Sequence, residues 1–257
     1  MQISLGTSTN PDISGSPGSF TVATFLTDDG GTNYYAVDTS TYSSVSITTG
    51  TLTSPAVSAN STIAYDSSVQ YNISFTTQHN VVQNGYVTID FPSTITIEDT
   101  SAAVAGCQAG INTGGTTTAA ACTVTSSQVV VTDLFTSGAA TGSIIVLVPG
   151  VRNARSLSTS SSFTVTTSDS SGNNIDTLSS GFTIAMTSVS DLQVVTVTNT
   201  NSTALNGFFD IYQVVVTAQT PTVNGDVLLV QFPTAFTFPT LSSSLSCAAG
   251  TNVTTIS

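Results

Sequence analysis

The feature that most constrains this chain is an internal repeat of about 140 residues. The same landmarks recur in the same order: Asn60-Ser-Thr, Tyr71, Asn84-Gly85, Phe91-Pro92 and Cys107 return as Asn201-Ser-Thr, Tyr212, Asn224-Gly225, Phe232-Pro233 and Cys247. Residues 10–19, which precede Phe20-Thr-Val, also match residues 153–162, which precede Phe163-Thr-Val. Because domains usually hold about 100–150 residues, the repeat predicts two copies of one module.

The repeat is displaced against the two ends of the sequence. Ser257 aligns near Thr117 of the first copy, and Met1 aligns near Ile144. The predicted segments are a closing strand or linker of a preceding module over 1–14, a first module over 15–150, and a second over 151–257 without its last strands. Either the sequence is a window on a longer array, or neighbouring subunits exchange strands.

Alternation of apolar and polar residues predicts β-strands along the chain. In Gln70–Thr76, Tyr71, Ile73 and Phe75 fall on one face. Asn-Gly pairs at 84–85 and 224–225 predict hairpin-type turns. Further strands are expected over 20–27, 86–91, 128–134, 143–148, 162–167, 182–187, 192–198, 208–217 and 226–232, and no segment keeps a helical period. We therefore expect an all-β fold of tandem immunoglobulin-like β-sandwich modules, the second incomplete.

Charge is scarce and one-sided. Charged residues make up 6% of the chain, the net charge is −12, and Arg152 and Arg155 are the only cations besides the single histidine. Nucleic acid is excluded as a partner because phosphate binding needs clustered Lys and Arg. No apolar run approaches the ~20 residues that cross a bilayer, so no membrane insertion is expected. Ser and Thr, roughly a third of the chain, would hydrate the surface instead.

Two of the three cysteines are close in sequence. Cys107 and Cys122 flank a Gly/Thr/Ala-rich stretch, and a disulfide between them would close a loop of about 15 residues. Cys247 would need a partner outside the sequence. A reactive thiol is the alternative, but His79 is the only imidazole and no cation lies near in sequence. A disulfide implies an oxidising compartment, so we expect an extracellular or cell-surface location.

Four asparagines begin Asn-x-Ser/Thr sequences, the acceptor motif for N-linked glycans. They are Asn60, Asn72, Asn201 and Asn252. Chance occurrence is the alternative in a chain this rich in Ser and Thr. However, Asn60 and Asn201 share one repeat position, and Asn72 falls on the face opposite Tyr71. Covalent glycans are therefore expected.

No residue pattern predicts a cofactor or an enzyme. Asp28-Asp29 and the acidic turn over 169–176 do not have the spacing of a calcium loop, and turn formation explains them. No phosphate loop, metal cluster or nucleophile elbow is present in the sequence. A catalytic triad would have to use the lone His79.

The order of motifs resembles repeats in large surface and secreted proteins of ciliates and other protists, and protomers of heavily glycosylated extracellular filaments. The matching motifs are the Asn60 turn, Tyr71–Phe75, Asn84-Gly85, Phe91-Pro92, the Cys pair, Val148–Asn153 and Ser162–Thr167. The resemblance covers nearly the whole chain. Asn10-Pro11 agrees with its pattern, whereas Asn153-Ala154 departs from it. The resemblance implies a fibril, sheath or glycocalyx role.

The leading hypothesis is a structural protomer of a glycosylated filament or surface stalk, self-associating head to tail into a linear polymer. An incoming strand would complete the open sheet. The expected donor is the segment Gln2, Ile3, Ser4, Leu5, Gly6 and Thr7. The alternative is an adhesin or binding module that recognises a partner through loops, with Tyr34-Tyr35 as the candidate patch. A spacer without self-association is a third hypothesis.

Overall fold

The computed structural model describes residues 10–11, 13–27, 34–43, 45–111, 117–136, 141–200, 212–220 and 224–236. Within these residues the chain forms sixteen β-strands and one short helix, which confirms the all-β class. The chain divides into two units, Met1–Val189 and Ser190–Ser257.

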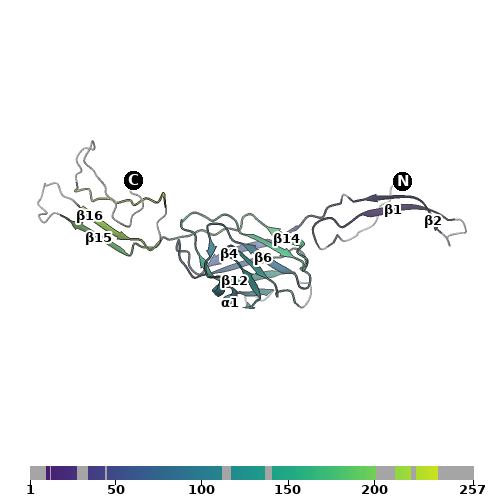
Figure 1. Cartoon of the computed structure of the whole chain (residues 1–257), viewed down its shortest axis with the longest axis horizontal. Helices are drawn as coiled ribbons and strands as arrows, with labels where there is room; N and C mark the ends of the chain where they lie inside the picture. Colours follow the sequence, from purple (N-terminus) through teal and green to yellow (C-terminus); the bar gives the residue numbers. More distant parts are fainter. Residues whose placement is uncertain are drawn as a thin grey trace, which may run out of the picture. The chain divides into compact units, whose positions relative to one another are not determined.

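The first unit contains a sandwich of two β-sheets (Figure 1). One sheet has the order β10 (Cys122–Val124), β11 (Gln128–Val131), β6 (Tyr86–Asp90), β13 (Thr164–Ser168), β14 (Asn174–Leu178) and β3 (Gly50–Thr51). The other has the order β4 (Thr53–Ala59), β5 (Val69–Thr76), β12 (Ser143–Arg152), β8 (Gln108–Ile111) and β9 (Thr118–Ala119), with β7 (Thr96–Ile97) also pairing with β12. The neighbours are antiparallel except β14 and β3.

The sandwich core follows from the alternation in its strands. Inward residues of β5 and β12 are buried while their neighbours are at least partly exposed. Four aromatic rings pack in the middle, with centroids 5.1–6.2 Å apart. They belong to Tyr71, Phe91, Phe163 and Phe182. Burial of each such side chain stabilises the fold by about 1.5–3 kcal/mol.

The disulfide between Cys107 and Cys122 joins the two sheets. Cys107 directly precedes β8 in one sheet, and Cys122 begins β10 in the other. Their Cα atoms lie 6.3 Å apart. This is the pairing that the sequence favours, and it closes one edge of the sandwich.

The helix α1 (Thr100–Gly106) was not predicted. It has only seven residues, too few to display a helical period, and it contributes one buried side chain, Ala103. Asp99 caps it by accepting a hydrogen bond from the backbone N of Ala102 at 2.8 Å. The cap, rather than the periodicity, was the available signal.

The predicted boundary between the modules at residue 150 differs from the structure. Strands β13 and β14 lie beyond that position, yet β13 pairs with β6 of the first module, with Val165 opposite Ile89. The sandwich therefore continues to Val189, where the first unit ends. Pairing between strands this far apart in sequence leaves no mark on local alternation.

Three local predictions also need correction. Residues 182–187 and 226–232 form no regular strand, although Phe163 and Ser160 donate backbone hydrogen bonds to the carbonyls of Phe182 and Ile184. Asn84-Gly85 is a turn, with a φ of 61° at Asn84, but it joins β5 and β6, which belong to different sheets. It is therefore not a hairpin turn.

Two further sheets contain only two strands each. In the first unit β1 (Phe20–Thr27) pairs with β2 (Tyr34–Tyr42), and in the second unit β15 (Val194–Asn199) pairs with β16 (Tyr212–Thr217). The sequence predicted β1 with these bounds. The tandem arrangement of immunoglobulin-like modules stays a prediction, since the described residues of the second unit form one hairpin.

Candidate functional site

The hairpin of β1 and β2 presents large apolar side chains to solvent on both strands. Each of the following is more than half exposed: Phe20, Val22, Phe25, Leu26, Tyr34, Tyr35, Val37 and Tyr42. Phe25 and Tyr34 pack only edge to face, with centroids 6.4 Å apart. A two-stranded sheet is marginally stable alone in water, and contiguous exposed apolar surface marks an interaction site. We call this surface the β1–β2 face.

One edge of this hairpin is open. β1 pairs with β2 along its whole length, from Phe20 opposite Tyr42 to Thr27 opposite Tyr34. Among the described residues no strand pairs with the other edge of β1. The unpaired N–H and C=O groups of such an edge are a template for an additional strand.

The second unit also exposes apolar side chains on its strands. In β15 and β16, Val195, Val197 and Val215 are exposed. Residues 226–231, for which the sequence predicts a strand, carry Val227 and Leu229 with exposures of 70% and 86%. This apolar segment pairs with no strand in the described part of the chain.

The repeat relates these exposed elements to strands of the sandwich, of which β5, β6 and β13 bury alternate side chains and β4 is mostly exposed. The pairing of Val194 with Thr217 is the pairing of Thr53 with Thr76 shifted by one repeat length. Thus β15 and β16 are the counterparts of β4 and β5. In the same way, Phe20-Thr-Val in β1 corresponds to Phe163-Thr-Val, which enters β13, and residues 226–231 correspond to β6.

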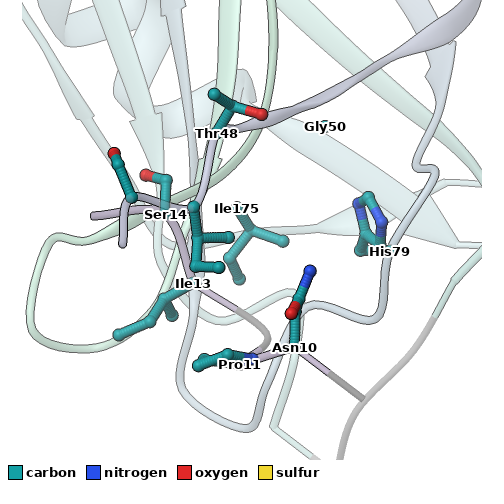
Figure 2. A pocket seen from close by; sticks show the side chains of 10 residues that line it. Asn10, Pro11, Ile13, Ser14, Thr48, Gly50, His79 and Ile175 are labelled. Carbon is teal, nitrogen blue, oxygen red and sulfur yellow. The ribbon is translucent and has the colours of Figure 1, made fainter. Parts of the chain in front are cut away.

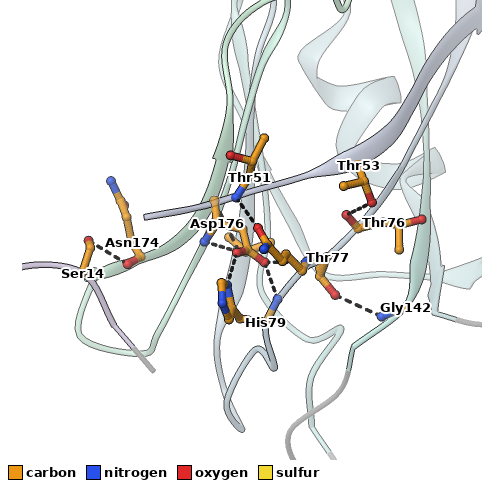
Figure 3. Close-up of polar contacts among 11 residues, drawn as sticks. Ser14, Thr51, Thr53, Thr76, Thr77, His79, Gly142, Asn174 and Asp176 are labelled. Atoms are coloured by element: carbon orange, nitrogen blue, oxygen red, sulfur yellow. Dashed lines mark hydrogen bonds and ion pairs between the residues drawn. The ribbon is translucent and has the colours of Figure 1, made fainter. Parts of the chain in front are cut away.

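A different kind of site, a polar one, lies where β14 meets the turn after β5 (Figure 3). The carboxylate of Asp176 is fully buried, and its Oδ2 accepts backbone hydrogen bonds from Gln78 and His79, both at 2.9 Å. Its Oδ1 lies 2.7 Å from Nδ1 of His79. A Cβ on Gly50 would lie 2.0 Å from Oδ1 of Asp176, so only glycine fits there.

A cleft of about 420 Å³ adjoins this cluster. Figure 2 shows the side chains that line it, among them Ile13, Ile175 and His79. Ser14 also lines it, but its hydroxyl donates to the carbonyl of Asn174 at 2.9 Å and its backbone N to the same oxygen. The hydrogen bonds of Asp176 and Ser14 therefore hold together β14, the turn after β5 and the segment around residue 14. The sequence drew attention to His79 as the lone imidazole and to Asp176 as part of an acidic turn, but not to their contact or to Gly50, because their approach depends on the fold.

The described sequons lie at the surface. Asn60 is exposed in the turn after β4, and its Oδ1 accepts a hydrogen bond from the backbone N of Gln70 at 2.9 Å. Asn72 is exposed on the outer face of β5. Asn201, Asn252 and Cys247 lie outside the described residues, as does the predicted assembly strand, residues 2–7.

A buried polar link holds the sequon turn of Asn60 in place. The hydroxyl of Tyr71 donates to Oδ1 of Asn153 at 2.6 Å, and Nδ2 of Asn153 donates to the carbonyls of Ser61 and Ile63. Burial raises the pKa of the Tyr71 hydroxyl, which therefore stays protonated as a donor. This role of Asn153 was not predicted from the sequence.

The two arginines lie close to Tyr65. Arg152 forms an ion pair with Glu98, and its guanidinium lies 4.2 Å from the ring centroid of Tyr65; that of Arg155 lies 6.0 Å away. The hydrogen bond with Glu98 raises the pKa of Arg152. Both arginines therefore interact with residues of the sandwich itself, through cation–π contacts and an ion pair.

The described residues contain no group of three or more His, Cys, Asp or Glu side chains able to hold a metal ion. Asp169 accepts hydrogen bonds from Nδ2 of Asn173 and from the backbone N of Asn173 and of Ser171, which lower its pKa. It stabilises a turn. Asp28 and Asp29 lie outside the described residues. In the same part of the chain, no helix has the length and apolarity needed to span a membrane.

No family model matches the chain, and no curated protein has a matching sequence. A solved structure, the collagen binding domain of the Erysipelothrix rhusiopathiae surface protein RspB, is similar at 15% identity with a TM-score of 0.31. The match covers 67% of this chain and 56% of that one. At this level of similarity the neighbour supports no conclusion about the fold or the function of this chain.

Proposed function

We propose that this protein is a non-catalytic structural protomer of an extracellular filament or surface stalk, in which copies associate head to tail. One observation carries the proposal. The exposed elements β1, β16 and residues 226–231 are repeat counterparts of β13, β5 and β6, whose inward side chains are buried in the sandwich. Strands whose counterparts are covered within the sandwich are uncovered at these positions. A second molecule of this protein is therefore the partner that we propose covers them.

The burial differences supply the driving force. The rings of Phe163 and Tyr71 are fully buried, whereas those of their counterparts Phe20 and Tyr212 are 53% and 37% exposed. Removing apolar surface from water contributes about 25 cal/mol per Å². Several large side chains on each partner are therefore available to favour association.

The surface chemistry agrees with an extracellular assembly. The disulfide is typical of an oxidising compartment. Glycans on Asn60 and Asn72, both exposed, would hydrate a surface that has few charges, and they belong to this proposal. The motif order that resembles protist surface repeats supports the same role.

Sedimentation velocity over a range of protein concentrations, with electron microscopy of the same samples, tests the proposal. We expect linear oligomers that lengthen with concentration. A variant with Phe20→Ser, Val22→Ser and Phe25→Ser should remain monomeric, and the matched control with Val104→Ser, an exposed residue of α1, should assemble like the wild type. A wild-type chain that stays monomeric throughout would contradict the proposal.

A second candidate function, an adhesin or binding module, is favoured by the exposure of Tyr34 and Tyr35 on β2. Exposed tyrosines are common in protein-binding surfaces because they combine a large apolar ring with a polar hydroxyl. The Tyr34→Ala, Tyr35→Ala variant separates the two functions. Loss of attachment to a surface with unchanged oligomer length would favour the adhesin.

A further inference from the structure

We infer that β1 of one copy pairs edge to edge with residues 226–231 of a second copy, antiparallel, in the register in which β13 pairs with β6. The inference rests on the proposed head-to-tail assembly and specifies its contact. It differs from the predicted donor strand, residues 2–7, because it uses a segment whose structure is described.

The hydrogen-bonding neighbours of β13 identify the missing partner of β1. Within the sandwich β13 lies between two strands, β14 on one edge and β6 on the other. Its counterpart β1 has a neighbour on one edge only, β2. Since β2, like β14, is the strand that follows along the chain, we assign the open edge of β1 to a counterpart of β6.

The counterpart of β6 is residues 226–231, and this segment has what the contact needs. The turn Asn84-Gly85 and the pair Phe91-Pro92, which enclose β6, recur as Asn224-Gly225 and Phe232-Pro233. The segment between them holds four consecutive apolar residues, Val227 to Val230, and contains no proline, so none of its residues lacks a backbone N–H. Its side chains are exposed, and it pairs with no other described strand.

The register of the sandwich gives the register of the contact. Thr164 of β13 lies opposite Asp90 of β6. Their repeat counterparts are Thr21 and Gln231, which should therefore face each other across the two copies. The segment has one residue more than β6 between its Asn-Gly and Phe-Pro landmarks, so we expect a β-bulge near Leu228.

The second copy is the occupant that the repeat favours. Side chains on the two faces are complementary because both are apolar: Phe20 and Val22 on one strand, Val227 and Val230 on the other. The pairing is heterologous, with different surfaces in contact, so it leaves the same two surfaces open at the ends of each oligomer and propagates. That is the geometry of a linear polymer.

Disulfide trapping tests the register. Two forms of the 257-residue chain, Thr21→Cys and Gln231→Cys, both with Cys247→Ser, are mixed under oxidising conditions. Opposed residues of adjacent strands lie within the 4.4–6.8 Å Cα separation, roughly, that a disulfide needs. We expect cross-linked heterodimers in the mixture and none from either variant alone.

The matched control replaces Thr21→Cys by Thr27→Cys, at the far end of the same exposed strand. Thr27 would lie about 20 Å from Gln231 in the inferred register, so this mixture should not cross-link. Oligomers that form without the Thr21–Gln231 cross-link, or with both cross-links equally, would overturn the pairing and leave the proposed assembly standing. Absence of oligomers at every concentration would overturn both.

Discussion

The residues Phe-Thr-Val begin β1 and lead into β13, and the two copies have opposite surroundings. In the sandwich, Phe163 and Val165 are fully buried between the two sheets, while Phe20 and Val22 at the corresponding positions are 53% and 62% exposed. The strand conformation is the same, and the neighbours differ: β13 has a strand on both edges, whereas β1 has one. Burial is therefore a property of the assembly of strands, and an exposed copy of a buried strand indicates what should cover it.

Substitution of the paired phenylalanines should give the largest contrast. Phe163→Ala removes a ring from the aromatic cluster and should lower the free energy of unfolding of the sandwich by about 3–5 kcal/mol. Phe20→Ala should leave that free energy unchanged and weaken association. Denaturant unfolding of the two variants at a concentration below the onset of assembly makes the measurement; equal effects on unfolding would refute the comparison.

The cysteines provide the next contrast. Removing the disulfide with Cys107→Ser and Cys122→Ser should cost the sandwich about 3 kcal/mol, because the cross-link closes a loop of 15 residues between two sheets. Cys247, the repeat counterpart of Cys107, is the control, and Cys247→Ser should not change the unfolding midpoint. A shift of the same size in both variants would show that the two copies of the module are equally dependent on their cysteines.

A smaller effect is expected from the buried carboxylate. Asp176→Ala leaves the backbone N–H groups of Gln78 and His79 without their acceptor, at a cost of about 1–3 kcal/mol. In the β1–β2 hairpin, Thr24 and Asp38 also share hydrogen bonds but both are exposed, so Thr24→Ala should cost much less. Thermal unfolding followed by circular dichroism distinguishes them. An unfolding midpoint of Asp176→Ala equal to that of the wild type would contradict the role of Asp176.

The smallest expected effect concerns the two tyrosines of the repeat. Tyr71→Phe removes the donor to Asn153 inside the core and should destabilise the sandwich by about 1 kcal/mol. Tyr212→Phe should have no effect on sandwich unfolding, since Tyr212 is in the second unit and partly exposed. If Tyr212→Phe destabilised the sandwich as much, the two units would unfold together.

The sequence predicted eight of the sixteen described strands, missed others such as β2, β4 and β14, and did not predict burial. Alternation located β1 and β16, because it reports which residues share a face. It does not report whether a partner covers that face, so it did not predict the exposure of Phe20, Val22 and Tyr42. The contacts among Gly50, His79 and Asp176 could not be predicted for a related reason: β3, β14 and the turn after β5 meet only through long-range pairing.

The most direct test of the account is amide hydrogen exchange of the whole chain, measured below and above the concentration at which oligomers form. The account predicts that the amides of β1 and of residues 226–231 exchange rapidly in the monomer and become protected together in the oligomer, while those of β13 and β6 are protected in both. Oligomers in which β1 and residues 226–231 keep exchanging as fast as in the monomer would contradict it.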